Sequence, residues 1–202
     1  PAISHIEIAL KLGMHVSTAN KGPVVHGKKM LTDIANEMNR KFYFESTVMD
    51  GAPVFALLRE TPPAAEIRSV RGVLNSTTNL ILSMMEEGKS FDDAVKYAQD
   101  IGIAETDPSG DVDGWDAAIK ISALVSIYMN TPMTPEMVDR TGIRDVTPGK
   151  IAEAKSQGKR WKLVCEAWRQ DGKILTKVAP QMVGTKSPMY TVDGSTSIVQ
   201  IK

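Results

Sequence analysis

The sequence has few of the features that mark secreted, membrane or nucleic-acid-binding proteins. Cys165 is the single cysteine among 202 residues, which excludes an intramolecular disulfide framework and fits a reducing cytoplasm. No apolar run approaches the roughly 20 residues of a membrane span, and no signal-peptide pattern occurs. Basic and acidic residues balance at 24 each, so no global field favours nucleic acid or an anionic membrane. We therefore expect a cytoplasmic protein that binds neither.

Common cofactor and catalytic signatures are also missing. The sequence has no G-x-G-x-x-G, no P-loop, no G-x-S-x-G and no H-E-x-x-H, so a complete dinucleotide fingerprint is not encoded. A calcium loop also fails. An EF-hand alignment would put Ser109 and Lys120 where Asp and a bidentate Glu are needed.

Helical and strand patterns alternate along the chain. Helical spacing occurs at 2–12, 27–40, 77–87, 91–100, 114–129 and 148–156. Strand patterns occur at 15–18, 42–45, 67–74, 161–168, 174–178, 188–192 and 197–201. Asp171-Gly172 predicts a hairpin between two of the late strands. We predict an α+β fold: a mixed, largely antiparallel open sheet with helices on one face. The late strands should join those at 42–45 and 67–74.

The first residues read as the end of another domain. The chain begins at Pro1, without methionine and inside a helical pattern, and a short strand and a turn follow. We expect an excerpt in which residues 1–25 are the remnant of a Rossmann-like α/β domain. Residues 26–202 should then form a substrate-binding and dimerisation domain.

The densest chemistry lies between Glu105 and Lys120. Five carboxylates crowd into a turn-rich run, namely Glu105, Asp107, Asp111, Asp113 and Asp116. Lys120 is the single charged residue of the helical stretch that follows, four residues after Asp116 on the same face. A partly buried lysine beside a carboxylate can be tuned for proton transfer. The alternative is a solvated acidic loop between helix ends. Lys120 leads us to favour a site for a cationic small-molecule group.

Two other motifs are weaker. Lys21 follows a strand, where ligands bind in open α/β sheets, although an exposed loop lysine is the simpler interpretation. The run 72–79, G-V-L-N-S-T-T-N, leads from a strand into a helix whose N-terminal N–H groups could face a carboxylate or phosphate. Ser76 or Thr77 acting as a plain N-cap explains that run equally well.

Four segments taken together resemble homoserine dehydrogenases. They are S-T-A-N-K-G-P, E-S-T-V-M-D-G-A-P-V-F, R-G-V-L-N-S-T-T-N and G-I-A-E-T-D-P-S-G-D-V-D-G-W-D-A-A-I-K, in the family's order. The resemblance implies NAD- or NADP-dependent interconversion of L-homoserine and L-aspartate 4-semialdehyde, a step towards threonine, methionine and isoleucine. It also implies a homodimer.

The resemblance assigns roles to individual residues. Lys120 matches the proton-transfer lysine, Asp116 its partner, and Lys21 an assisting lysine near substrate and nicotinamide. The substrate-binding residues by this match are Glu105, Asp111, Asp116 and Thr77. Those beside the cofactor are Ala19, Asn20, Lys21 and Gly102. Backbone carbonyls of the loop containing Glu45, Val48, Asp50 and Ala52 match the site of a monovalent cation, usually sodium.

The chain also departs from the family's pattern. The N-terminal Rossmann half and the closing C-terminal glycine-rich segment have no counterpart here, and Ser76 stands where many members have glycine. We therefore expect the excerpt alone to bind dinucleotide poorly and to be inactive. One alternative is a redox-inactive module for homoserine binding or dimerisation. Another is a dehydrogenase of the same scaffold that acts on a different substrate.

Overall fold

The computed structural model describes residues 2–60 and 65–202, which form two compact units. The first unit comprises Pro1–Glu66 and Ser122–Thr134, and the second comprises Ile67–Ile121 and Pro135–Lys202. Helix α8 (Trp115–Tyr128) begins in the second unit and ends in the first. Each unit is defined by the contacts within it, so the division does not test the domain boundary predicted after residue 25, which stays a prediction.

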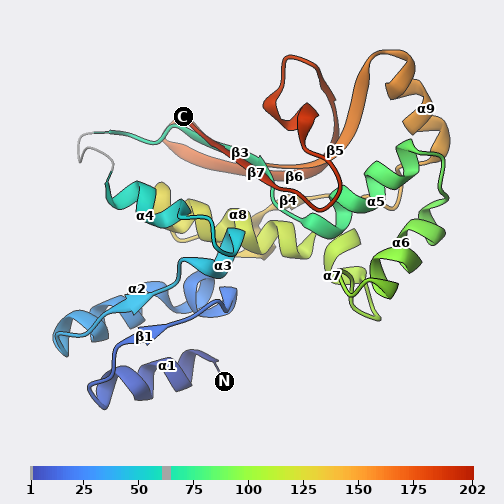
Figure 1. The fold of residues 1–202 in the computed structure, drawn as a ribbon. Coiled ribbons are helices and arrows are strands. Elements are labelled where there is room, and N and C mark those ends of the chain that lie inside the picture. Colours follow the sequence, from blue (N-terminus) through green and yellow to red (C-terminus); the bar gives the residue numbers. More distant parts are fainter. Residues whose placement is uncertain (1, 61–64) are drawn as a thin grey trace. The chain divides into compact units, whose positions relative to one another are not determined.

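The first unit is built on two helices and a small parallel sheet. Its elements are α1 (Ala2–Lys11), β1 (Val16–Ser17), α2 (Lys21–Glu37), β2 (Phe42–Tyr43), α3 (Ser46–Met49) and α4 (Val54–Arg59) (Figure 1). Strand β1 pairs in parallel with β2. Helices α1 and α2 bury Ile6, Leu10, Leu31 and Ala35 between them, at the spacing that gives each helix one apolar face.

Helix α2 starts six residues earlier than the sequence pattern predicts. The side chain of Asn20 caps it by accepting from the backbone N–H of Gly22 at 3.0 Å. Pro23 lies in the first turn, where its missing N–H breaks no helical hydrogen bond. The predicted start at Gly27 is therefore wrong, because the Asn-Lys-Gly-Pro run opens a helix instead of forming a turn before it.

The second unit is built on a five-stranded sheet. Its strands are β3 (Ser69–Val73), β4 (Asp139–Arg140), β5 (Lys159–Gln170), β6 (Lys173–Gly184) and β7 (Ile198–Ile201), in the order β4-β6-β5-β3-β7. The β4–β6 pair is parallel and the other pairs are antiparallel. The β5–β6 hairpin turns at Asp171 and Gly172, whose φ angles of 50° and 73° suit a tight two-residue turn.

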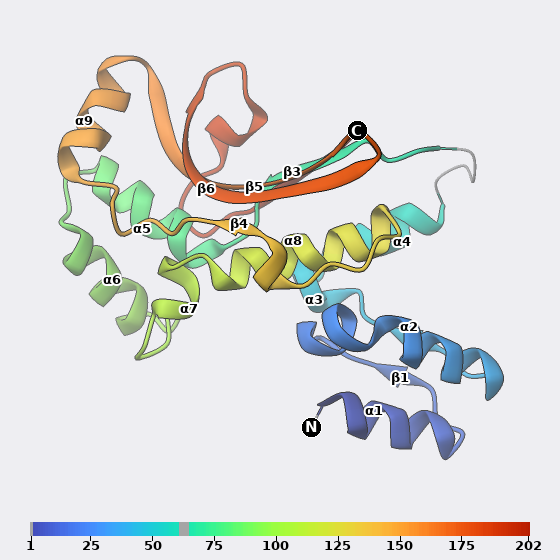
Figure 2. The same cartoon turned by 180° about the vertical axis from the view of Figure 1, so that it is seen from behind.

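Helices cover one face of this sheet. They are α5 (Ser76–Glu86), α6 (Phe91–Asp100), α7 (Ser109–Val112), α9 (Pro148–Ser156) and the first half of α8, and α5, α6 and α9 lie together at one end (Figure 2). Cys165 of β5 points to α8, where its Sγ lies 3.9 Å from the carbonyl of Ala117. Burial raises the pKa of this thiol to about 12, so Cys165 behaves as a core residue.

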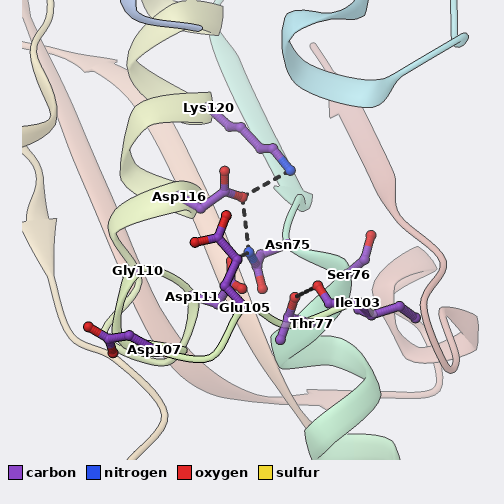
Figure 3. A pocket seen from close by; sticks show the side chains of 10 residues that line it. All are labelled: Asn75, Ser76, Thr77, Ile103, Glu105, Asp107, Gly110, Asp111, Asp116 and Lys120. Atoms are coloured by element: carbon purple, nitrogen blue, oxygen red, sulfur yellow. Dashed lines mark hydrogen bonds and ion pairs between the residues drawn. The ribbon is translucent and has the colours of Figure 1, made fainter. Parts of the chain in front are cut away.

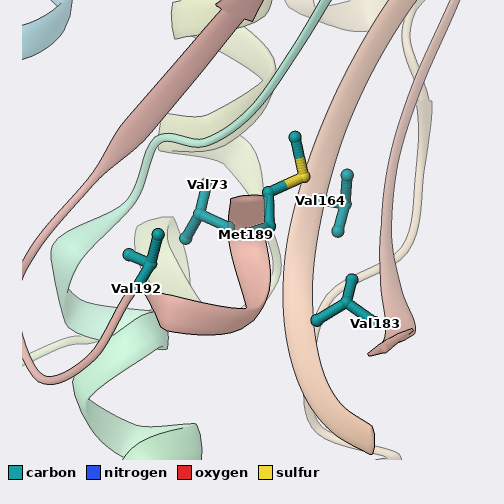
Figure 4. Packing of buried hydrophobic residues seen from close by; sticks show 5 residues of the cluster. All are labelled: Val73, Val164, Val183, Met189 and Val192. Carbon is teal, nitrogen blue, oxygen red and sulfur yellow. The ribbon is translucent and has the colours of Figure 1, made fainter. Parts of the chain in front are cut away.

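The opposite face is covered at one end by the segment that leads to β7. This segment contains the short 3-10 helix η2 (Pro188–Thr191), and a second, η1 (Pro135–Met137), precedes β4. The apolar cluster beneath the segment consists of Val73, Val164, Val183, Met189 and Val192 (Figure 4). Because successive strand residues alternate in direction, Val164 faces this cluster while Cys165 faces α8.

The predicted fold class is confirmed, with two local corrections. Residues 188–192 form η2 rather than a strand, because Ser187 caps a turn that Pro188 opens. The strand predicted at 42–45 pairs with β1 alone and does not join the five-stranded sheet. The strand predicted at 67–74 does take β5 and β7 as neighbours. Within the described residues, no helix is long and apolar enough to cross a membrane.

Candidate active site

A lysine–carboxylate pair stands at the centre of the second unit. The Nζ of Lys120 lies 3.0 Å from Oδ2 of Asp116, one helical turn earlier on α8. Both side chains are mostly buried, at 16% and 20% exposure. Nζ also donates to the carbonyl of Leu74 at 2.7 Å, at the end of β3. The ammonium is thus held between a helix and the residue that follows β3.

The turn between β3 and α5 completes the arrangement. Asn75, 3% exposed, is the N-cap of α5, and its Oδ1 accepts from the backbone N–H of Thr78 at 2.8 Å. Its Nδ2 donates to Oδ1 of Asp111 at 2.6 Å and to Oδ2 of Asp116 at 2.9 Å (Figure 3). The cap predicted at Ser76 or Thr77 therefore lies one or two residues earlier, at Asn75.

These residues border a cavity of about 360 Å³. It is lined by Asn75, Ser76, Thr77, Ile103, Glu105, Asp107, Gly110, Asp111, Asp116 and Lys120. The lining contains four carboxylates and one ammonium, so the cavity favours a ligand that carries positive charge. Figure 3 shows Glu105, Asp111 and Asp116 gathered near Lys120, whereas Asp107 lies apart. The Oδ1 of Asp107 accepts from the hydroxyl and the N–H of Ser109, which lowers the pKa of that carboxyl.

The acidic loop is fixed from behind by the segment after β4. Arg144 pairs with Asp113 at 2.5 Å, and the Ile143 N–H donates to the carbonyl of Val112 at 2.8 Å. A Cβ on Gly142 would lie 2.2 Å from that same carbonyl and 2.6 Å from Cα of Asp113. Only glycine allows the two backbones to approach so closely. The loop that bears the site carboxylates thus rests on a backbone contact.

Comparison with known proteins decides the family. The family model described as homoserine dehydrogenase matches residues 53–202. The chain belongs to the homoserine dehydrogenase family. It is 36% identical over 201 residues to an NAD(+)-dependent homoserine dehydrogenase of Pseudomonas canavaninivorans, covering 98% of this chain and 57% of that protein. It is 38% identical over 203 residues to a homoserine dehydrogenase of Methanocaldococcus jannaschii, covering 100% of this chain and 59% of that protein.

Solved structures agree with this assignment. A crystal structure of a homoserine dehydrogenase from Thiobacillus denitrificans superposes with a TM-score of 0.93 at 35% identity, covering 100% of this chain and 47% of that one. One from S. aureus gives a TM-score of 0.85 at 31% identity, covering 100% and 48%. The chain therefore spans between about half and three fifths of the length of these relatives.

The structure brings five of the six predicted catalytic and substrate-binding residues into one cavity, and Lys21 is the sixth. Lys120, Asp116, Glu105, Asp111 and Thr77 all line it. Thr77 is buried, and its hydroxyl donates to the carbonyl of Ile103 at 3.3 Å. The predicted roles of these residues stay predictions, because the structure gives their geometry and not their chemistry.

The predicted cofactor residues divide between the two units. Ala19, Asn20 and Lys21 lie at the start of α2 in the first unit, whereas Gly102 follows α6 in the second. The start of a 17-residue helix with a lysine at its first position suits an anionic group. Gly102 has φ +74° and open space where a Cβ would stand. The cofactor roles of these four residues, and the meeting of Lys21 with Lys120, stay predictions.

The predicted cation loop lies in the first unit. The Oε1 of Glu45 accepts from the N–H of Phe55 at 2.6 Å and of Ala56 at 3.2 Å, which caps α4. Asp50 follows α3 with φ +43°, a conformation that reverses the chain. No group of three or more His, Cys, Asp or Glu side chains in the described ranges could hold a metal. A cation at this loop would depend on backbone oxygens, as the resemblance implies.

Sequence reasoning missed the role of Asn75. The signal was present, because Asn is among the strongest N-cap residues and directly precedes the predicted helix. The N-cap role accounts only for the hydrogen bond that the amide oxygen accepts. The two hydrogen bonds that Nδ2 donates could not be predicted, because their acceptors Asp111 and Asp116 lie 36 and 41 residues away in the sequence.

Proposed function

We propose that the chain is the substrate-binding and catalytic part of a homoserine dehydrogenase, which interconverts L-homoserine and L-aspartate 4-semialdehyde. The observation that carries the proposal is the Lys120–Asp116 pair at the wall of an acidic cavity. A module that only binds homoserine would need carboxylates for its ammonium and an unpaired cation for its carboxylate, whereas Lys120 is already paired with Asp116 at 3.0 Å. The lysine therefore favours the enzyme over a redox-inactive module.

Each residue has a chemical part in the oxidation of homoserine. Glu105, exposed at the cavity, pairs with the substrate ammonium, and Asp111 adds negative charge beside it. Lys120 in its neutral form takes the proton of the substrate hydroxyl, while Asp116 orients Nζ and stabilises the ammonium that results. In the reverse direction Lys120 returns the proton to the carbonyl oxygen. Thr77, at the N-terminal turn of α5, helps to orient the substrate.

The cofactor would be held by Ala19, Asn20, Lys21 and Gly102. When bound, the nicotinamide of NAD or NADP accepts or supplies the hydride at the substrate carbon that bears oxygen. In this proposal residues 1–25 are the end of the nucleotide-binding domain and 26–202 are the substrate and dimerisation domain. A sodium ion on the carbonyls of Glu45, Val48, Asp50 and Ala52 would fix the loop before α4.

A homodimer is the proposed assembly in the cytoplasm. The sheet face opposite α8 carries Arg71, Glu166 and Gln181, joined by an ion pair of 2.6 Å and hydrogen bonds of 2.9 and 2.6 Å. Leu175 adds apolar area on this face, at 39% exposure. A second copy would cover the face, as open sheet faces favour. Sedimentation of the full-length gene product at micromolar concentration tests this, and a monomeric mass would contradict it.

The activity is tested on the purified full-length gene product. We expect formation of reduced nicotinamide when L-homoserine and NAD or NADP are supplied, followed by absorbance. L-threonine and L-serine serve as comparison substrates, because both carry the same ammonium and carboxylate. Homoserine-independent turnover, or equal rates with all three, would contradict the proposed substrate.

A further inference from the structure

Asn75 uses its whole amide within the second unit. Its Oδ1 accepts from Thr78 N–H at 2.8 Å, and its two Nδ2 hydrogens go to Asp111 and Asp116. The orientation of the amide is fixed by its partners. A rotated amide would place its oxygen against two carboxylates and its NH₂ against an N–H donor. A side chain that is 3% exposed and fully satisfied has one conformation available.

The two carboxylates that Asn75 bridges come from different elements. Asp111 lies on α7 and Asp116 on α8, and without a donor between them their charges would repel. Oδ2 of Asp116 accepts from Asn75 at 2.9 Å and lies 3.0 Å from Nζ of Lys120. The amide therefore fixes the same oxygen atom that faces the lysine.

Lys120 also contacts the turn that contains Asn75. Its Nζ donates to the carbonyl of Leu74, the residue before Asn75. One dipeptide at the end of β3 thus contacts both members of the pair. Displacement of Asn75 would move Asp116 and Lys120 relative to each other.

We propose that Asn75 is a positioning residue of the reaction: a neutral donor that aligns Asp116 on Lys120 for the exchange of the lysine proton. This inference rests on the proposed function, in which Lys120 carries the proton. The choice of a neutral side chain follows from the site. The titratable groups around the pair are Glu105, Asp111 and Cys165, with Asp107 farther along the cavity wall and Glu166 on the opposite face of the sheet. A further carboxylate among them would hold the lysine proton more tightly.

The decisive variant is Asn75→Asp in the full-length enzyme. Aspartate keeps the shape and the capping oxygen but replaces both donors with negative charge. We expect kcat for homoserine oxidation to fall about 10- to 100-fold at neutral pH, as for the loss of charge-assisted hydrogen bonds. The rising limb of kcat against pH should move upward by about one unit, with part of the rate recovered at high pH.

Two further variants separate positioning from capping. Asn75→Ser keeps an uncharged capping oxygen but replaces the two amide hydrogens with a single hydroxyl hydrogen on a shorter side chain. It can therefore no longer bridge Asp111 and Asp116, and kcat should fall about 10-fold with the pH profile in place. If Asn75→Asp does not fold, this variant carries the test. Ser90→Ala removes the matched cap of α6, whose Oγ accepts from Asp93 N–H at 3.1 Å. It should lower the melting temperature and leave kcat, KM and the pH profile unchanged.

The outcomes distinguish the inference from the function on which it rests. If the unaltered enzyme does not oxidise homoserine, the proposed function is wrong. If it does, and both Asn75 variants lose only thermal stability as Ser90→Ala does, Asn75 is a cap and the inference is wrong. An unmoved pH profile in a folded, slowed Asn75→Asp enzyme also contradicts it.

Discussion

Two asparagines at the start of α5 each bind in the network of one lysine: Asn75, the N-cap, and Asn79, one turn later. The two lysines differ in their access to a cavity. Asn75 lies beside Lys120 and donates to the carboxylate that the lysine faces. Asn79 instead accepts from Nζ of Lys162 at 2.8 Å, and that Nζ also donates to the carbonyl of Val192 at 2.6 Å. Lys162 is completely buried and lines none of the described cavities.

The catalytic candidate Lys120 differs from the structural Lys162 in its access to a cavity and in its anionic partner. Burial lowers the pKa of Lys162 to about 8, and the nearby charge of Arg160 adds to this effect. A lowered proton affinity alone would suggest catalysis, but no substrate can reach this amine. Lys120 has an anionic partner and a cavity beside it. A shifted pKa therefore identifies a catalytic site only where the group is also accessible to a substrate.

The largest effect that would test this contrast is on turnover. Lys120→Ala in the full-length enzyme should reduce kcat by about 10²–10⁴-fold, the usual contribution of a general acid–base group. Lys120→Arg should not restore the rate, because a guanidinium keeps its charge but does not release its proton readily. The Lys162→Met enzyme should have an unchanged kcat when the rate is calculated per folded molecule. Near-native turnover of Lys120→Arg would show that the residue acts only as a fixed charge.

The next effect concerns the loop that supplies the carboxylates. Gly142→Ala should push Val112 and Asp113 away and displace the acidic loop, since the new Cβ would meet backbone atoms. Kinetic assays should show kcat/KM reduced by about 100-fold, as for a misplacement of about 1 Å. Gly184→Ala is the matched control, because a Cβ there meets nothing within 4 Å. Equal activity of the two variants would mean that the loop adapts freely.

A smaller effect distinguishes the carboxylates of the cavity. Glu105→Ala should raise KM for homoserine by about 10- to 100-fold, more than it lowers kcat, through loss of a charge-assisted contact to the ammonium. Asp107→Ala should change KM much less, because that carboxylate is bound to Ser109. Steady-state kinetics of both variants measure the difference. A larger KM effect at Asp107 would reverse the assignment.

The smallest effect is on stability at high pH. Unfolded Lys162 holds its proton to about pH 10.5, whereas in the fold its pKa is about 8. The unfolded state binds more protons between these values, so this residue makes the free energy of unfolding rise with pH there. Urea denaturation at pH 8 and pH 10 should show a smaller rise for Lys162→Met. An identical rise in both proteins would mean that Lys162 titrates normally.

The sequence was informative where the signal was local. The Asp171–Gly172 hairpin and the helical spacing between Asp116 and Lys120 depend on neighbouring residues, and the structure contains both. Contacts between distant segments could not be derived in this way. Two such contacts depend on how separate elements pack. They are the hydrogen bond from Asn75 to Asp111 and the close backbone contact of Gly142 with Val112. Local reasoning also failed at η2, where a proline-led turn looked like a strand.

The sheet order also determines when the second unit can be completed during synthesis. The β5–β6 hairpin can form as soon as it leaves the ribosome, because its partners are adjacent in the chain. Strand β3 gains β5 soon after but must wait for β7, more than 120 residues downstream, to cover its other edge. Until Ile198–Ile201 emerge, the strand that ends at the Leu74–Asn75 turn has an unpaired edge open to other nascent chains. Translation speed and chaperone supply would then govern how much of the protein reaches its folded state.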